Sequence, residues 1–108
     1  MSFNINEVSS DMLSAIKGAV AENWPEVKST AEQFLQNREE RLTLLAELRI
    51  KGDISQVKFD SRLLDEKLIL EAELNALAVL SKAIAQNAAN AALEILENAV
   101  KAAISAAI

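Results

Sequence analysis

Carboxylates are the residues in this sequence whose types and spacing come closest to a chemical site. Glu94 and Glu97 are three residues apart, so they would share one face of a helix, and a folded-back chain would bring Asp11 near them. Helical bundles bind pairs of metal ions with Glu side chains and Glu-x-x-His motifs, but this sequence contains no histidine. We therefore predict no metal ligand, and a carboxylate-only metal-binding bundle is the third of three hypotheses for function.

Other catalytic chemistry is also poorly supported. Cysteine, tyrosine and histidine are absent, so a serine nucleophile would need a lysine or a carboxylate as its base. Ser14 and Lys17 have the Ser-x-x-Lys spacing, but the motifs that accompany it in serine-dependent enzymes are missing. No glycine-rich loop is present to bind phosphate. We predict no catalytic residue and no cofactor, and we expect the protein not to be an enzyme.

The charge pattern argues against nucleic acid as a partner. The net charge of the 108 residues is −5, whereas a phosphate-binding surface needs an excess of Lys and Arg. Seven of the eleven basic residues lie in 38–67, but this segment also holds seven acidic residues, which indicates a solvated, salt-bridged surface. We find neither a signal peptide nor a stretch near the ~20 apolar residues of a membrane span. We expect a cytoplasmic protein without a nucleic-acid partner.

Helix-forming residues fill almost the whole chain. Glycine occurs only at Gly18 and Gly52 and proline only at Pro25, and β-rich folds need more turn residues. Pro25 disfavours helix at Trp24, and Gly52 suits a helix end. After Ser55 nothing stops a helix, which would be about 80 Å long at ~1.5 Å per residue. The predicted fold is a single all-α domain with a flexible arm over 1–8 and helices over 9–23, 25–51 and 55–107. These helices form a long antiparallel hairpin, with a kink at Trp24-Pro25 and a turn at Gly52.

The last helix carries more apolar surface than one neighbour can cover. Folding back at Gly52 sets residues opposite each other when their numbers sum to about 105 or 106, which places Leu13 and Ile16 beside Ala89 and Leu93. The apolar surface that remains predicts a homo-oligomer, most simply a dimer that forms a four-helix bundle. The predicted interface residues are Leu70, Leu74, Leu77, Ile84, Ala88, Ala91 and Ile95.

Two features each allow two interpretations. Trp24 beside Pro25 is either packed at the kink or an anchor for a partner, because Trp is enriched at the energetic centres of interfaces. The second feature is a set of amides in the last helix, Gln86, Asn87, Asn90 and Asn98. They either fix the register and oligomeric state of the bundle or face solvent.

Three short motifs are spread over most of the chain: Trp24-Pro25-Glu26-Val27-Lys28, Gly52-x-Ile54 and Asn90-Ala91-Ala92. Together they resemble a group of small uncharacterised bacterial proteins that are expected to be helical. This resemblance implies the all-α fold and no activity, ligand or site residue. In size and helical plan the chain also resembles the small secreted WXG-type hairpins, although their Trp-x-Gly motif lies at the turn, where this chain has Gly52.

These observations predict a non-enzymatic structural or protein-interaction module that self-associates through its Ala- and Leu-rich last helix. Its partners would be a second copy of the chain and another helical protein. The alternative is a membrane-active or secreted helical protein whose amphipathic C-terminal segment, 93–108, contacts lipid.

Overall fold

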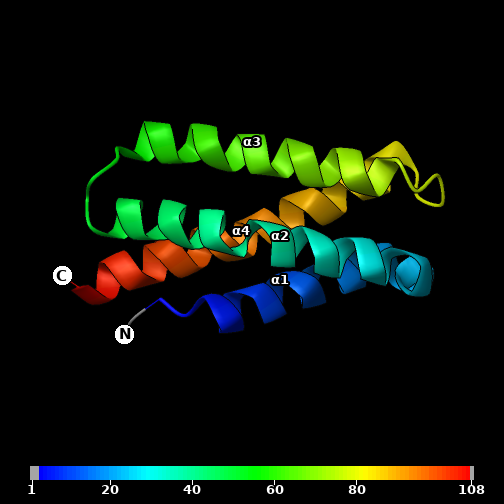
Figure 1. Ribbon diagram of the computed structural model, residues 1–108, viewed down its shortest axis with the longest axis horizontal. Helices are drawn as coiled ribbons and strands as arrows, with labels where there is room; N and C mark the ends of the chain where they lie inside the picture. Colours follow the sequence, from blue (N-terminus) through cyan, green and yellow to red (C-terminus); the bar gives the residue numbers. More distant parts are fainter. Residues whose placement is uncertain (1–2, 108) are drawn as a thin grey trace.

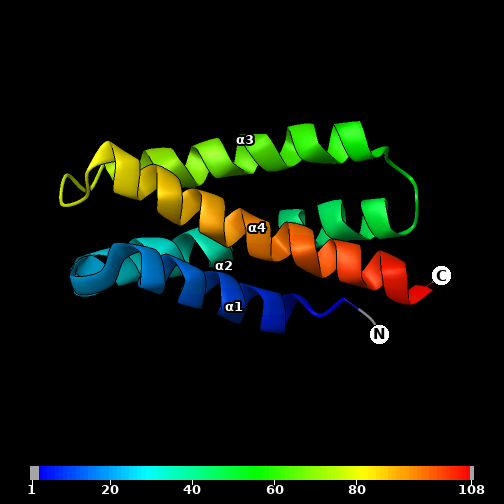
Figure 2. The same cartoon turned by 180° about the vertical axis from the view of Figure 1, so that it is seen from behind.

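Residues 3–107, which the computed structural model describes, form four α-helices and one short 3-10 turn. These are α1 (Ile5–Val20), η1 (Ala21–Asn23), α2 (Trp24–Ile50), α3 (Gln56–Asn75) and α4 (Lys82–Ala107). Successive helices run in opposite directions, and the start of α1 and the end of α4 lie at the same end of the molecule (Figure 1). Seen from behind, α4 lies between α1 and α3 (Figure 2). The predicted all-α bundle is confirmed as an antiparallel four-helix bundle.

The first helix begins earlier than the sequence predicts because Asn4 caps it. The Asn4 side-chain oxygen accepts hydrogen bonds from two backbone N–H groups of the first turn, at 3.0 and 3.3 Å, which satisfies two donors that a helix start leaves free. Val8, one turn further along, is buried in the core. The helix predicted over 9–23 is therefore Ile5–Val20, and only residues 1 and 2 of the predicted arm fall outside the described residues.

The predicted single helix over 55–107 is divided in two by a turn at residues 76–81. Ala78 adopts a left-handed backbone with φ of 63°, and the Ser81 hydroxyl accepts a hydrogen bond from the Ile84 N–H at 3.1 Å. The chain turns here without glycine or proline because folding back buries apolar surface on both sides of the turn. Leu80 lies within the turn and is 6% exposed. Burial of apolar surface thus outweighs the local preference of alanine for helix.

The kink predicted at Trp24-Pro25 is a reversal of the chain. Ala21 ends α1 with φ of 52°, so α2 runs back along α1 (Figure 1). In the predicted hairpin residues 76–81 face 24–30, directly after the turn at 21–23, so the structure is that hairpin folded once across its middle. The predicted register survives the folding: Phe3 shares a cavity wall with Ala102, and these two numbers sum to 105.

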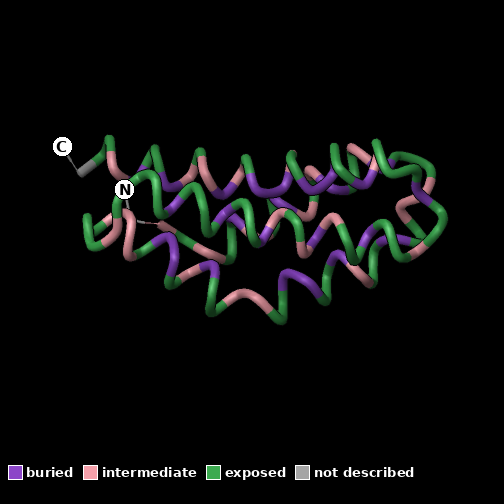
Figure 3. The backbone as a smooth tube through the Cα atoms, turned by 90° about the horizontal axis from the view of Figure 1, so that it is seen from above, coloured by how far each residue is buried: buried purple, intermediate pink, exposed green. Residues whose placement is uncertain are grey.

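The core contains three of the seven residues that were predicted to contact a second chain. Buried residues line the inner faces of the helices (Figure 3). Of the predicted interface, Leu70, Leu74 and Ala88 are 0% exposed within one chain, and Leu77, Ile84, Ala91 and Ile95 are half-buried. The predicted four-helix bundle is thus built from a single chain, and those three buried side chains are not accessible to a partner.

The left-handed conformation at Ala78 should make this turn a place where glycine stabilises the protein. A left-handed backbone costs a residue with a Cβ about 1–2 kcal/mol, and glycine avoids that cost while losing more entropy on folding. We expect Ala78→Gly to raise the free energy of unfolding by about 1 kcal/mol in urea denaturation. Ala102→Gly, at an exposed site inside α4, is the matched control and should lower it by about 1 kcal/mol. Equal losses in both variants would show that Ala78 is not strained.

Candidate functional site

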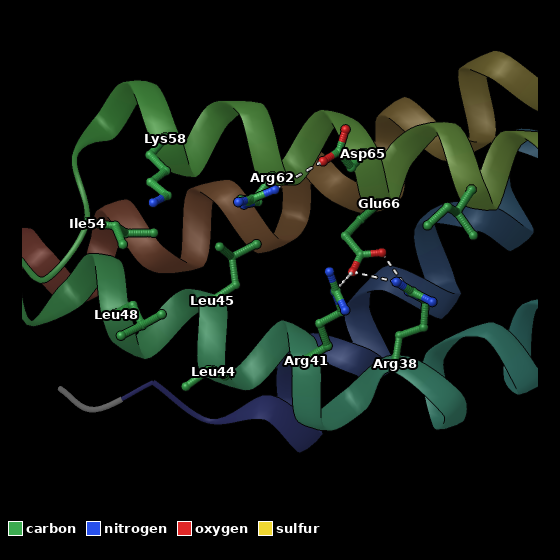
Figure 4. Close-up of a pocket in the computed structure, with 11 residues that line it drawn as sticks. Arg38, Arg41, Leu44, Leu45, Leu48, Ile54, Lys58, Arg62, Asp65 and Glu66 are labelled. Atoms are coloured by element: carbon green, nitrogen blue, oxygen red, sulfur yellow. Dashed lines mark hydrogen bonds and ion pairs between the residues drawn. The ribbon is translucent and has the colours of Figure 1, made fainter.

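A groove runs along the outer surface between α2 and α3 and has a volume of about 410 Å³. Its apolar lining is Leu44, Leu45, Leu48, Ile54 and Ile69, and its charged lining is Arg38, Arg41, Lys58, Arg62, Asp65 and Glu66. The side chains reach into the space from both helices (Figure 4). The α2 lining extends over residues 38–48, which is about 15 Å at ~1.5 Å per residue. The groove therefore follows about three turns of α2.

A buried ion cluster closes one side of the groove. Glu66 on α3 is 2% exposed, and Arg38 on α2 donates to both of its carboxylate oxygens, from Nε at 2.6 Å and from Nη2 at 3.0 Å. Arg41 Nε lies 3.2 Å from Glu66 Oε1 (Figure 4). This two-pronged contact is the strongest geometry for an arginine and a carboxylate. The hydrogen bonds to Glu66 raise the pKa of Arg38 above its usual value, so Arg38 stays charged.

The local sequence explains why an acid is buried at this position. The inward face of α3 follows the series Phe59, Leu63, Glu66, Leu70 and Leu74, with spacings of three and four residues, and Glu66 is the only charged member. A buried carboxylate without a partner would be costly. Arg38 and Arg41 supply the partners, and every described buried side-chain polar atom has one. The cluster therefore fixes how α2 and α3 face each other along the groove.

The groove is positively charged on an acidic protein. Four cations and two acids line it, whereas the whole chain has a net charge of −5. Glu66 is neutralised within the cluster, and Asp65 makes only a long contact with Arg62, at 3.8 Å. Arg41 and Arg62 have exposed side chains, at 69% and 54%. The rim therefore offers cationic groups to a ligand in solution.

The groove also contains apolar surface that water reaches. Leu44 is 56% exposed, and Leu48, Ile54 and Ile69 are half-buried along the same opening. The lining contains no hydroxyl, thiol or imidazole group. This arrangement is suited to binding an amphipathic molecule that carries negative charge.

The structure separates the carboxylates that the sequence suggested as a metal site. Asp11 lies beside a cavity between α1 and α4, whereas Glu94 and Glu97 line a groove between α3 and α4, and Glu97 contacts Lys101 at 3.5 Å. Within the described residues, no three acidic side chains gather closely enough to hold a metal ion. Ser14 and Lys17, the two residues of the Ser-x-x-Lys spacing, are both exposed on α1.

The structure gives the positions of Trp24 and of the four amides within one chain, and both interpretations of each feature stay predictions. Trp24 is half-buried at the first position of α2 and packs against the core. The four amides are all exposed: Gln86, Asn87, Asn90 and Asn98.

Sequence reasoning missed Glu66, which belonged to a segment assigned to a solvated surface. The signal that could have found it was a single acid within an otherwise apolar series at helical spacing.

Comparisons with protein-family models, curated proteins and solved structures find no match to this chain. Its function therefore has to be inferred from its own geometry, and the resemblance to small bacterial helical proteins stays a prediction. None of the helices described in residues 3–107 is both long enough and apolar enough to cross a membrane.

Replacing Glu66 should destabilise the bundle although the change is small in size. Glu66→Gln keeps the shape of the side chain but leaves Arg38 without its carboxylate in a partly buried site. Removing one partner of a buried pair costs up to several kcal/mol, and Arg38 is 24% exposed, so water recovers part of that cost. We expect the free energy of unfolding to fall by about 2 kcal/mol. Glu40→Gln, at an exposed position of α2, should change it by less than about 0.5 kcal/mol, and similar values for the two variants would contradict the role of the cluster.

Proposed function

We propose that this protein is a non-enzymatic protein-interaction module whose groove between α2 and α3 binds an acidic, amphipathic helix of another protein. The observation that supports the proposal is the combination of an apolar floor with cations on both rims. Arg38 and Arg41 lie along one rim, and Lys58 and Arg62 lie along the other. A groove between two helices is a common binding site for an amphipathic helix, which places its apolar face inward.

The proposed partner would contact both the apolar floor and the cationic rims of the groove. Its apolar side chains would cover Leu44 and Leu48, which now contact water. Acidic side chains on its flanks would meet Arg41 and Arg62, whose guanidinium groups are mostly exposed. Because the rest of the protein is acidic, the positive groove would also orient an acidic partner during its approach.

The burial of α4 favours this groove over the interaction predicted for the last helix. Leu93, Leu96 and Val100 are buried in the bundle, so a membrane-active C-terminal segment would first have to leave the core. Self-association through the apolar face of α4 meets the same obstacle. The α2–α3 groove needs no such rearrangement, since Leu44 is already exposed.

Binding of a synthetic helix with a defined charge pattern tests this proposal. The probe is a fluorescent amphipathic peptide with leucines along one face and glutamates along both flanks, and the comparison peptide has lysines in place of the glutamates. We expect fluorescence anisotropy to show binding of the glutamate peptide only. Arg41→Glu with Arg62→Glu should weaken that binding at least about tenfold, because repulsion replaces attraction at both rims.

A matched variant separates the groove from the overall charge of the protein. Lys17→Glu with Lys28→Glu makes the same change in net charge at exposed positions outside the groove, and its affinity for the peptide should stay within about threefold of the wild type. Equal losses in the two double variants would indicate a general charge effect and contradict the proposal. Failure of the glutamate peptide to bind at all would do the same.

A further inference from the structure

The outer face of α3 carries a row of apolar side chains that nothing in the described chain covers. Val57 is 80% exposed, Leu64 is 48% exposed and Leu68 is 51% exposed, and the exposed Ser61 lies between them. We call these four residues the α3 stripe. Other large apolar residues of α3, such as Phe59 and Leu70, face the core. The α3 stripe is thus a second apolar face on a helix that already packs inside the bundle.

The spacing of the α3 stripe is that of a helix that pairs with another helix. Successive members are four, three and four residues apart, as the apolar positions of a coiled coil are. The stripe ends at Glu71, the next position in the series. It therefore covers about three turns of helix in total, which suits a small interface.

Charged residues border the α3 stripe in a pattern that is complementary to itself. Lys58 and Asp65 lie along the edge that faces the α2–α3 groove, and Asp60 and Lys67 lie along the opposite edge. Each edge therefore carries one positive and one negative side chain, seven residues apart. A 180° rotation that reverses the direction of α3 about the centre of the stripe exchanges the positions of the positive and the negative side chain on each edge.

We propose that a second copy of this chain docks on the α3 stripe, with the two α3 helices antiparallel about a twofold axis. Val57 then packs against the partner's Leu68, and Leu64 packs against the partner's Ser61. All four stripe residues of both copies become covered. The arrangement is isologous, because the same patch is used on both sides.

The charges select the antiparallel arrangement. It brings Asp60 to the partner's Lys67 and Lys58 to the partner's Asp65, and the twofold axis repeats both contacts, so four attractive pairs border the stripe. In a parallel arrangement the helix edges meet in another register, and Asp60 faces the partner's Asp65 on both sides. Like charges at these edges oppose association. Within one chain the charges are only weakly engaged: the Asp65–Arg62 contact is 3.8 Å, and Asp60 accepts a hydrogen bond from Gln56.

This interface leaves the α2–α3 groove open. Leu44, Leu45 and Leu48 belong to α2 and do not contact the stripe of a second copy, whereas Lys58 and Asp65 occupy the border between the two surfaces. Because Lys58 and Asp65 lie on the groove side of both α3 helices, the twofold axis places the two grooves on one side of the dimer. The two surfaces share Lys58 and Asp65, so each is tested at residues that belong to it alone: Asp60 and Lys67 for the dimer, and Arg41 and Arg62 for peptide binding.

Charge exchange on the edge away from the groove tests the proposal. Sedimentation equilibrium of the wild-type chain up to about 1 mM, where small interfaces associate, should show a concentration-dependent rise towards twice the monomer mass. Asp60→Lys alone and Lys67→Asp alone should each weaken self-association at least about tenfold, because both pairs on the edge away from the groove become repulsive. A mixture of the two variants should recover the wild-type association, since each variant then meets its opposite charge.

Several results would overturn the proposal. A wild-type chain that stays monomeric throughout the series would mean that a different partner covers the stripe. Stronger self-association of Asp60→Lys would indicate the parallel arrangement. Leu64→Gln with Leu68→Gln should abolish association, whereas Leu44→Gln, at a residue that is 56% exposed outside the stripe, should not; a dimer that tolerates the first pair uses another surface. Circular dichroism melting of each variant confirms that the bundle is intact.

Discussion

The packing of α1 against the alanine face of α4 is the contact on which the rest of the structure depends. Ala85, Ala88, Ala89 and Ala92 are 0% exposed on α4, and α1 makes its most extensive helix contact there. Small side chains let helix backbones approach closely, and Met12 and Ile16 of α1 are fully buried as well. This contact joins the first helix to the last and closes the ring of four helices. The turns at Ala21 and Ala78, where alanine has a positive φ, are tolerated because they allow α1 and α4 to make this contact.

The closed ring also explains why the candidate functional surfaces lie on α2 and α3. α4 is apolar on most sides, and its large apolar residues are used inside the bundle. α3 buries only one face, which is held to α2 by the Glu66 cluster. Its other faces are left with exposed Val57, Leu64 and Leu68 and with cations along the groove. The sequence made α4 look most suited to association, but α4 packs inside the bundle. The candidate binding surfaces lie instead on α3 and along its groove with α2.

Sequence reasoning recovered the fold class and the pairing register but not the folding of the hairpin. The register followed from one reliable signal, Gly52, which has φ of 81° at the turn between α2 and α3. The division at residues 76–81 could not be predicted, because Ala76 and Ala78 favour helix locally and the reversal is driven by contacts with α1 that are distant in sequence. The buried Glu66 was missed for a related reason. A carboxylate in an apolar series is visible in the sequence, but only the structure shows that Arg38 lies across from it.

The antiparallel neighbours α1 and α4 belong to opposite ends of the chain, and this has a consequence for the order of folding. The contacts of α2 with α3 join segments that follow one another, so little loop entropy opposes them. Those of α1 with α4 join the most distant segments of the molecule. During synthesis the apolar side of α1, with Met12 and Ile16, must wait for the last helix to emerge, and a chain interrupted before α4 exposes that side to other proteins. The seam between α1 and α4 is therefore the last part of the bundle to close.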